Sequence, residues 1–487
     1  VARDITYFWR NYFSADGLGH EGSPTYSAYG VATLGEKLYG VKGDFDTSAP
    51  YYDAKVGGLN LLGMPVYIDC ACKFPYYVTD DDDHYISWED SCYGAQRSTA
   101  QIARIERYGG GVPEKHRKYY NFTYADDNTL EGVTFDRSRL LPSLMLHDRR
   151  KAILRAGQVR QPAVVSLDFT KVCGHYHEAA QTLMVHACGQ ELASDLGYMG
   201  STHFLTTQWI RTWPAHNCLC IRGGDGSASA ARHLRGDLRK HFIVTPRFQL
   251  VDTAEYDAAD WADFGSDQVG ENGRLVLLVS PTEEHQYVVD LVRGKGGATH
   301  DYYLHSHGLA LQTDGIDLSP VADTEQDLYE YSGWTYSSAA GHGAHNITEL
   351  AAGEGSGVWR ATWSRIDDYR GRDAGDPMID EEAFMRLWMV DTPGSEVIVG
   401  TAPAQRYLRN QDIGRTMKVL CARRLNTDAV DVFSAVIEPY RTTEFIRTVR
   451  PLELGGGDEY CRGLAVETIH GTDYVISYGG PGVPPEV

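Results

Sequence analysis

The sequence predicts a multidomain α+β protein with helices near its N-terminus and strands in most of the remainder. At 487 residues the chain is long enough for about two to four domains with a large buried core. Glycine (51 copies) and tyrosine (31 copies) are frequent, and β-branched residues recur in short runs. This composition favours sheets joined by tight turns. Near residue 130 the apolar spacing changes from a helical to a strand-like pattern.

The first hundred residues carry the helical pattern. The stretches "ITYFWRNYF" and "SAYGVATLGEKLYGV" place apolar residues at three- and four-residue intervals, as amphipathic helices do. The stretch "SADGLGHEGSPTY" between them is typical of a loop, because it contains glycine and proline. The acidic run "TDDDDHY" at 79–85 also indicates a loop. We therefore expect a helical region over 1–105.

Short strands separated by turn residues follow. The segments "RKAILRAG", "PAVVSLDFT", "RLVLLVSP", "QYVVDLVRG" and "HDYYLHSHG" predict a large antiparallel β-sandwich over 106–345. A second strand-rich block, which includes "SGVWRATWSRI", "FMRLWMV" and "TMKVLCARR", predicts a smaller C-terminal β-domain over 346–487. The Gly-rich stretch 337–357 is the best candidate for a linker between the two.

The charge limits the classes of partner. A net charge of −21 argues against general nucleic-acid binding, which needs a basic surface. Two basic stretches, "DRRKAILRAGQVR" and "RHLRGDLRKH", can still attract an acidic substrate locally. Taken alone, each stretch is interpreted as solvated surface charge in preference to a binding site. We expect no membrane partner either, because no apolar run has the length of a membrane span.

Two histidines and an aspartate form the main candidate site. His177 lies in "GHYHE", Asp195 follows eighteen residues later, and His216 lies in "TWPAHN". Two imidazoles and one carboxylate form a good ligand set for a divalent metal, and zinc suits them by ligand softness. The spacing alone is weak evidence, because such residues occur in most chains of this length. The alternative is that they are ordinary polar residues of a strand edge.

The order of the motifs around these residues adds a resemblance. "GHYHEAAQTLMVHACGQELASDLGY" (174–198) followed by "WIRTWPAHN" (209–217) resembles the central β-domain of the heparinase II/III-like polysaccharide lyases. "KAILRAGQVRQPAVVSLDF", "HQYVVDLVRGKGGATHDYYLHSHG" and "VDVFSAVIEPY" resemble further strands of that family, in the expected order. "ADGLGHEGSPTY" resembles a loop of its helical toroid. The resemblance implies the C-terminal part of an α/α toroid, then a large antiparallel β-sandwich and a smaller C-terminal β-domain.

The resemblance also implies roles for residues of the central motif. His177, Asp195 and His216 would bind a zinc ion that organises the loops and is structural rather than the chemical agent. His175, the first histidine of the G-H-x-H motif, would face the substrate as a catalytic residue. Arg211 would contact a substrate carboxylate or sulfate, although surface placement explains it equally well.

The toroid loops supply the other expected site residues. His20 matches the family's group for proton transfer or carboxylate neutralisation best, and Glu21 is the neighbouring substrate-binding candidate. Tyr77 is the expected catalytic tyrosine, with Tyr76 as its alternative. The sequence departs from the family here, because Asp80, Asp81 and Asp82 stand where the family has Pro-Asp-Gly.

By resemblance, the protein is expected to cleave a uronic-acid-containing acidic polysaccharide, of alginate or glycosaminoglycan type. The reaction would be β-elimination, which leaves an unsaturated uronate end. One alternative is a zinc-dependent hydrolase in which the metal activates a water. Another is a non-catalytic glycan-binding protein that kept the sandwich. We expect a secreted or periplasmic enzyme, although no signal peptide is visible in this chain. The enzyme could also form a homo-oligomer.

Overall fold

A computed structural model gives the structure of the protein, and the chain divides into two compact units. The first unit comprises Val1–Pro142, Leu146–Arg149 and Cys173–Tyr176, and the second comprises Ser143–Met145, Arg150–Val172 and His177–Val487. The structure describes residues 11–14, 18–20, 22–30, 78–79, 84–91, 140–159, 161–169, 177, 181–200, 202–226, 236–255, 269–322, 326–335, 343–366, 382–406, 413–425, 429–455 and 459–478.

In the first unit, the described residues include one short helix, α2 (Pro24–Tyr29). It begins at Pro24 because the Ser23 hydroxyl accepts a hydrogen bond from the Tyr26 amide (3.4 Å) and proline suits the first helical position. The helix therefore begins inside the stretch that we expected to be a loop. Most of the expected helical region, including 1–10, 31–77 and 92–105, lies outside the described residues, so the α/α toroid is not shown.

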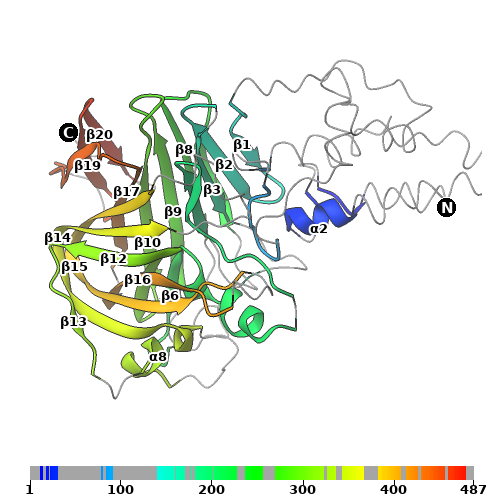
Figure 1. Ribbon diagram of the computed structural model, residues 1–487. Helices are drawn as coiled ribbons and strands as arrows, with labels where there is room; N and C mark the ends of the chain where they lie inside the picture. Colours follow the sequence, from blue (N-terminus) through cyan, green and yellow to red (C-terminus); the bar gives the residue numbers. More distant parts are fainter. Residues whose placement is uncertain are drawn as a thin grey trace, which may run out of the picture. The chain divides into compact units, whose positions relative to one another are not determined.

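The strands that the structure describes form three antiparallel sheets (Figure 1). The five-stranded sheet holds β1 (Leu144–Leu146), β2 (Lys151–Ala156), β3 (Ala163–Asp168), β4 (Thr182–Ala187) and β5 (Gln190–Ala193), in sequence order. The three-stranded sheet holds β18 (Ile446–Pro451), β19 (Arg462–Thr468) and β20 (Gly471–Ser477). The twelve-stranded sheet holds β6 (Leu219–Arg222), β7 (Gly236–Phe242), β8 (Phe248–Glu255), β9 (Val269–Val279), β10 (Tyr287–Gly296), β11 (Thr299–Ser306), β12 (Gly308–Asp314), β13 (Ser319–Pro320), β14 (Thr348–Ile366), β15 (Phe384–Pro403), β16 (Thr416–Leu425) and β17 (Asp431–Tyr440).

Among the described residues of the second unit, the helical segments are short and lie between strands. They are the π-helix η5 (Thr206–Ile210), the 3-10 helices η6 (Trp213–Ala215) and η9 (Ala344–Asn346), and α8 (Leu328–Tyr331). Among the described residues, no helix has both the length and the apolar character needed to cross a membrane.

The sequences of β9 and β10 explain why the twelve-stranded sheet is the middle layer. They carry the apolar runs "LVLLV" and "YVVDLV" rather than an alternating pattern. Because neighbouring residues of a strand point to opposite faces, such strands are buried on both sides. Val276 and Leu278 pack into the core shared with the five-stranded sheet. Leu275 and Leu277 pack into the core shared with the three-stranded sheet. The predicted antiparallel β-sandwich is therefore confirmed.

The Gly-rich stretch expected to be a linker, 337–357, contains η9 and the first part of β14. The strand tolerates its glycines because β14 pairs with β15 from Thr348 to Trp363. The pairing of β14 with β15 shifts register at two points, and one of them lies between Gly355 and Gly357. Gly357 has a φ of 69° there. The strands on both sides of residue 345 thus pair in one sheet, and β18 to β20 form the separate C-terminal sheet.

Candidate functional site

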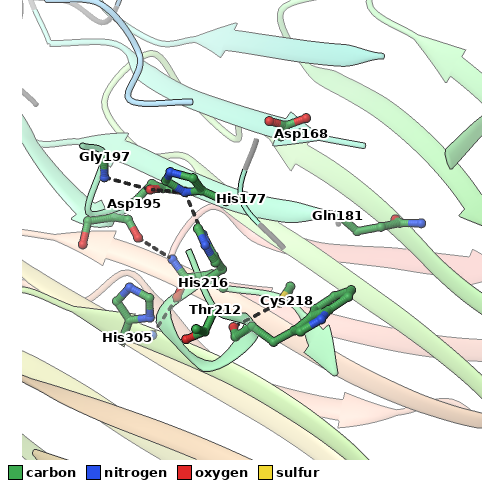
Figure 2. A network of polar contacts seen from close by, with 12 residues as sticks. Asp168, His177, Gln181, Asp195, Gly197, Thr212, His216, Cys218 and His305 are labelled. Carbon is green, nitrogen blue, oxygen red and sulfur yellow. Dashed lines mark hydrogen bonds and ion pairs between the residues drawn. The ribbon is translucent and has the colours of Figure 1, made fainter. Parts of the chain in front are cut away.

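Three polar residues of the second unit meet inside the protein, and they are the three expected metal ligands. His177, Asp195 and His216 are 4%, 3% and 1% exposed, and one ligand atom of each lies within 4.8 Å of the other two. His216 Nδ1 is 2.9 Å from Asp195 Oδ2, and His177 Nδ1 is 3.9 Å from Asp195 Oδ1. Figure 2 shows the three side chains pointing toward one another. This group can hold a metal ion.

Local structure fixes the positions of the aspartate and the second histidine. β4 and β5 form a hairpin whose turn residues, Cys188 and Gly189, both have positive φ (56° and 68°), as a type I′ turn requires. Asp195 follows β5, and its Oδ1 accepts a hydrogen bond from the Gly197 amide (2.9 Å). His216 ends η6 at the C-cap position. The β4–β5 hairpin and the short helix η6 therefore bring Asp195 and His216 together.

The neighbours of Asp195 stabilise its ionised carboxylate. Burial alone would raise the pKa of Asp195, but His216 opposes this by charge attraction and a hydrogen bond. His177 and the Gly197 amide act in the same direction, and together they hold the pKa of Asp195 below its ordinary value. The carboxylate is therefore charged at neutral pH in a buried site. A divalent cation would compensate this charge, so the group fits a metal by ligand type and by charge.

Asn217, the residue after His216, holds four segments together. Its Nδ2 donates to the Ser194 carbonyl (3.0 Å), and its Oδ1 accepts from the His305 amide of β11 (2.8 Å). Its own carbonyl accepts from the Leu183 amide of β4 (3.0 Å) and from Arg274 Nη1 of β9 (2.6 Å). The asparagine of the Ala-His-Asn motif therefore positions the metal group, a role that the sequence analysis did not assign.

Two buried arginines support the site, and the sequence analysis missed both. Arg406 donates to the Asp195 carbonyl (2.7 Å) and to Glu191 Oε2 (2.8 Å). Arg274 forms a two-pronged pair with Asp290, with contacts of 2.7 and 2.6 Å. Arg406 is 211 residues from Asp195, and Arg274 is 57 residues from Asn217. No local sequence pattern links residues so far apart.

His20 lies in the first unit on a well-anchored turn. Its amide donates to the Tyr12 carbonyl (2.8 Å), and its carbonyl accepts from Arg149 Nη1 (3.3 Å). Its ring packs edge-on against the Tyr12 ring, with 4.5 Å between centroids. The preceding Gly19 amide donates to the Ser27 hydroxyl of α2 (2.9 Å). The imidazole is nevertheless exposed, so a ligand can reach it.

Arg211 is half-buried at the end of η5, and its guanidinium lies 5.9 Å from the centroid of the Tyr198 ring. Arg211 is not a member of the close metal group. The remaining expected site residues, namely Glu21, Tyr76, Tyr77 and His175, lie outside the described residues. Their roles stay predictions.

Two basic residues of the first basic stretch, "DRRKAILRAGQVR", are buried in the fold. Lys151 is fully buried and pairs with Asp168 across β2 and β3. Arg155 is 2% exposed, and burial lowers its pKa to about 9. The interpretation of this stretch as solvated surface charge is therefore wrong for these two residues. In the second stretch, Arg239 lies 3.9 Å from the buried Asp252.

Comparisons with known proteins give structural neighbours but no sequence relatives. Neither a protein-family model nor a curated protein matches the sequence. The structure is similar to heparan sulfate lyase HepC from Pedobacter heparinus, with a TM-score of 0.54 and 12% identity over 99% of this chain and 62% of that chain. It is also similar to a heparinase III, with a TM-score of 0.52 and 15% identity over 98% and 62% of the two chains.

A second heparinase III, the BT4657 gene product, has a TM-score of 0.55 and 11% identity, over 98% of this chain and 61% of that chain. At these identities the similarity shows the fold. The present chain spans about 62% of the length of the lyases that it matches. The fold is thus that of heparinase III structures, as the order of the sequence motifs predicts.

Proposed function

We propose that the protein is a polysaccharide lyase that cleaves a uronic-acid-containing acidic polysaccharide, of alginate or glycosaminoglycan type, by β-elimination. One observation carries the proposal. The His177–Asp195–His216 group is closed and buried within a sandwich whose fold is that of heparan sulfate lyases. These residues come from the G-H-x-H…Asp…Ala-His-Asn order that resembles the same class of enzyme.

The reaction needs a base, an acid and a group that neutralises the substrate carboxylate. The base removes the proton on C5, a double bond forms between C4 and C5, and the bond from C4 to the departing oxygen breaks. The acid then protonates that oxygen. Negative charge develops on the carboxylate at C6, so hydrogen bonds or positive charge must stabilise it. Every atom and electron pair is accounted for without a co-reactant.

Histidine and tyrosine side chains suit these tasks near neutral pH. We assign proton transfer to His175 and Tyr77, with Tyr76 as the alternative tyrosine. His20, which is exposed on its anchored turn, would serve proton transfer or carboxylate neutralisation. Glu21 and Arg211 would contact the polymer. These assignments rest on the motif resemblance and on the chemistry of each residue type.

We assign zinc to the buried group, in a structural role. Its three ligands are at most 4% exposed, which supports an ion that stabilises the fold rather than one that contacts the polymer. A bound zinc would cross-link the segments that carry His177, Asp195 and His216. The same burial argues against a zinc-dependent hydrolase, which needs an open coordination position that faces the substrate.

The partner that this function requires is an acidic glycan. A protein with a net charge of −21 would not bind nucleic acid in general. Polysaccharides do not cross membranes, so we propose that the enzyme acts in a secreted or periplasmic location.

The test is an activity screen of the full chain on alginate, heparan sulfate, hyaluronan and ulvan. The expected result is a rise in near-ultraviolet absorbance from the new C4–C5 double bond on at least one polymer. Activity is expected to be lost in His175→Ala and Tyr77→Phe. Tyr474→Phe is a matched control, because Tyr474 is 64% exposed on β20, and should leave the rate unchanged.

Two outcomes would contradict the proposal. Cleavage products that are fully saturated would indicate a hydrolase. Glycan binding with no turnover on any polymer, measured on folded wild-type protein, would indicate a non-catalytic glycan-binding protein.

A further inference from the structure

His305 is a buried histidine near the metal group to which no role has been assigned. It lies on β11 and is 0% exposed. Neither of its ring nitrogens makes a hydrogen bond of ordinary geometry with the described residues, although the Ser194 backbone lies close enough to interact with the ring. Burial, with charge repulsion from His216 and Arg406, lowers the pKa of His305 to about 3, although Asp195 and the Ser194 backbone oppose this. A neutral imidazole buried in this way is costly unless a polar partner satisfies it.

His216 has a matching buried nitrogen. Its Nδ1 faces Asp195 at 2.9 Å, whereas its Nε2 makes no hydrogen bond with any described residue. The hydroxyl of Ser194, which precedes Asp195, is a third buried polar group in this situation. His305 lies close enough to His216 and Asp195 for both to affect its protonation. Figure 2 draws His305 below Asp195 and to the left of His216.

The backbone holds His305 at a fixed position relative to His216. The His305 amide donates to Asn217 Oδ1 (2.8 Å), and Asn217 is the residue after His216. Asn217 Nδ2 in turn holds the Ser194 carbonyl (3.0 Å). The three unsatisfied polar groups therefore belong to residues that one asparagine connects.

A histidine that binds a metal through one ring nitrogen normally donates its other N–H to a polar partner, which fixes the ring. We propose that His305 is a positioning residue of the metal centre, whose imidazole accepts the Nε2–H of His216 through one bound water. This contact keeps His216 Nδ1 turned toward Asp195 and the metal. The inference rests on the metal site assigned under the proposed function.

The imidazole ring suits this task better than another side chain would. A neutral imidazole has one donor and one acceptor nitrogen, so it can pair with His216 Nε2 whether that atom carries the proton or not. His305 is not itself a member of the close group of ligand atoms. Its role is therefore to orient a ligand rather than to bind the ion.

The test compares zinc binding in three full-length variants with wild type. His305→Phe removes both nitrogens at similar volume, and His305→Gln keeps a polar group. His300→Phe is the matched control, because His300 is on the same strand and equally buried but bonds to Asp431 (2.7 Å) and the Gly296 carbonyl (2.6 Å). Zinc affinity is measured by competition with a chelator, and the number of bound imidazoles by X-ray absorption at the zinc edge.

We expect His305→Phe to weaken zinc binding by about 10- to 100-fold, the usual effect of removing an outer partner of a metal ligand. His305→Gln should lose less, and His300→Phe should bind zinc as wild type does even if it unfolds at a lower temperature. Two imidazoles per zinc are expected in wild type. If His305→Phe does not fold, the wild-type imidazole count and His305→Gln decide.

Three results would overturn the inference. They are wild-type zinc affinity in the folded His305 variants, three imidazoles on the wild-type zinc, and a wild-type protein that binds no zinc. None of them depends on turnover, so they are distinct from failure of the lyase proposal, which is read from polymer products.

Discussion

At the scale of single residues, the site depends on one buried negative charge. Asp195 is 3% exposed, yet its pKa lies below the ordinary value because His216, His177 and the Gly197 amide stabilise the carboxylate. An aspartate in this state provides both a ligand atom and the charge that attracts a cation. It is the residue whose substitution should separate metal binding from the fold most cleanly.

We predict that Asp195→Asn lowers zinc affinity by at least about 100-fold, because the side chain keeps its shape but loses its charge and its anionic ligand atom. The measurement is zinc per chain after dialysis, together with the melting temperature with and without added zinc. Asp168→Asn is the control, because Asp168 pairs with Lys151 and is not in the metal group. Stoichiometric zinc in Asp195→Asn would contradict the assignment.

The pH dependence of stability follows from His305. Its pKa falls from 6.5 to about 3 on folding, so below pH 6.5 the unfolded chain binds a proton that the folded chain does not. Stability is therefore complete above the unfolded value and is lost as the pH falls below it. Urea midpoints of metal-free protein should decrease between about pH 6.5 and about pH 4, and less steeply in His305→Phe, by up to about one proton. Equal slopes in both proteins would contradict this account.

At the scale of elements, β9 connects the strands to the site. Arg274 of β9 pairs with Asp290 of β10 and donates to the carbonyls of Gln181 and Asn217, both at 2.6 Å. Tyr302 of β11 donates to the same aspartate at 2.9 Å. One buried ion pair thus fixes the start of β4 and the segment that carries His216.

We predict that Arg274→Met destabilises the fold by about 3–5 kcal/mol, because it leaves the Asp290 charge buried without its partner. Urea unfolding in excess zinc measures the change. Arg447→Met is the control, because Arg447 and Glu467 are exposed and 3.9 Å apart, and it should cost less than about 1 kcal/mol. Similar values for the two variants would show that the buried pair does not support the fold.

The strands were predictable because their signal is local. The runs that become β2, β3, β9, β10, β11, β16 and β17 are β-branched or aromatic and end at turn residues, so the sequence alone locates them. The prediction of a linker over 337–357 was wrong for most of the described part of this stretch. Its glycines indicate a linker, whereas pairing with β15 makes these residues a strand. The local sequence does not show which other strand a segment will pair with.

At the scale of the whole molecule, the order of motifs predicted more than any single spacing. His177, Asp195 and His216 came together as expected, because they lie in one ordered series of motifs. Arg406, Arg274 and His305 were not predictable, because they reach the site from remote strands and loops through folding of the sheets. His175 and Tyr77 stay predictions, since they lie outside the described residues.

The central claim is β-elimination on a uronate polymer, and the mass of the products tests it most directly. The full chain is incubated with the polymer that it depletes, and the masses of the oligosaccharide products are measured by mass spectrometry. We predict products with one unsaturated end, lighter by one water than hydrolysis products. Saturated products with the mass of hydrolysis products would contradict the account.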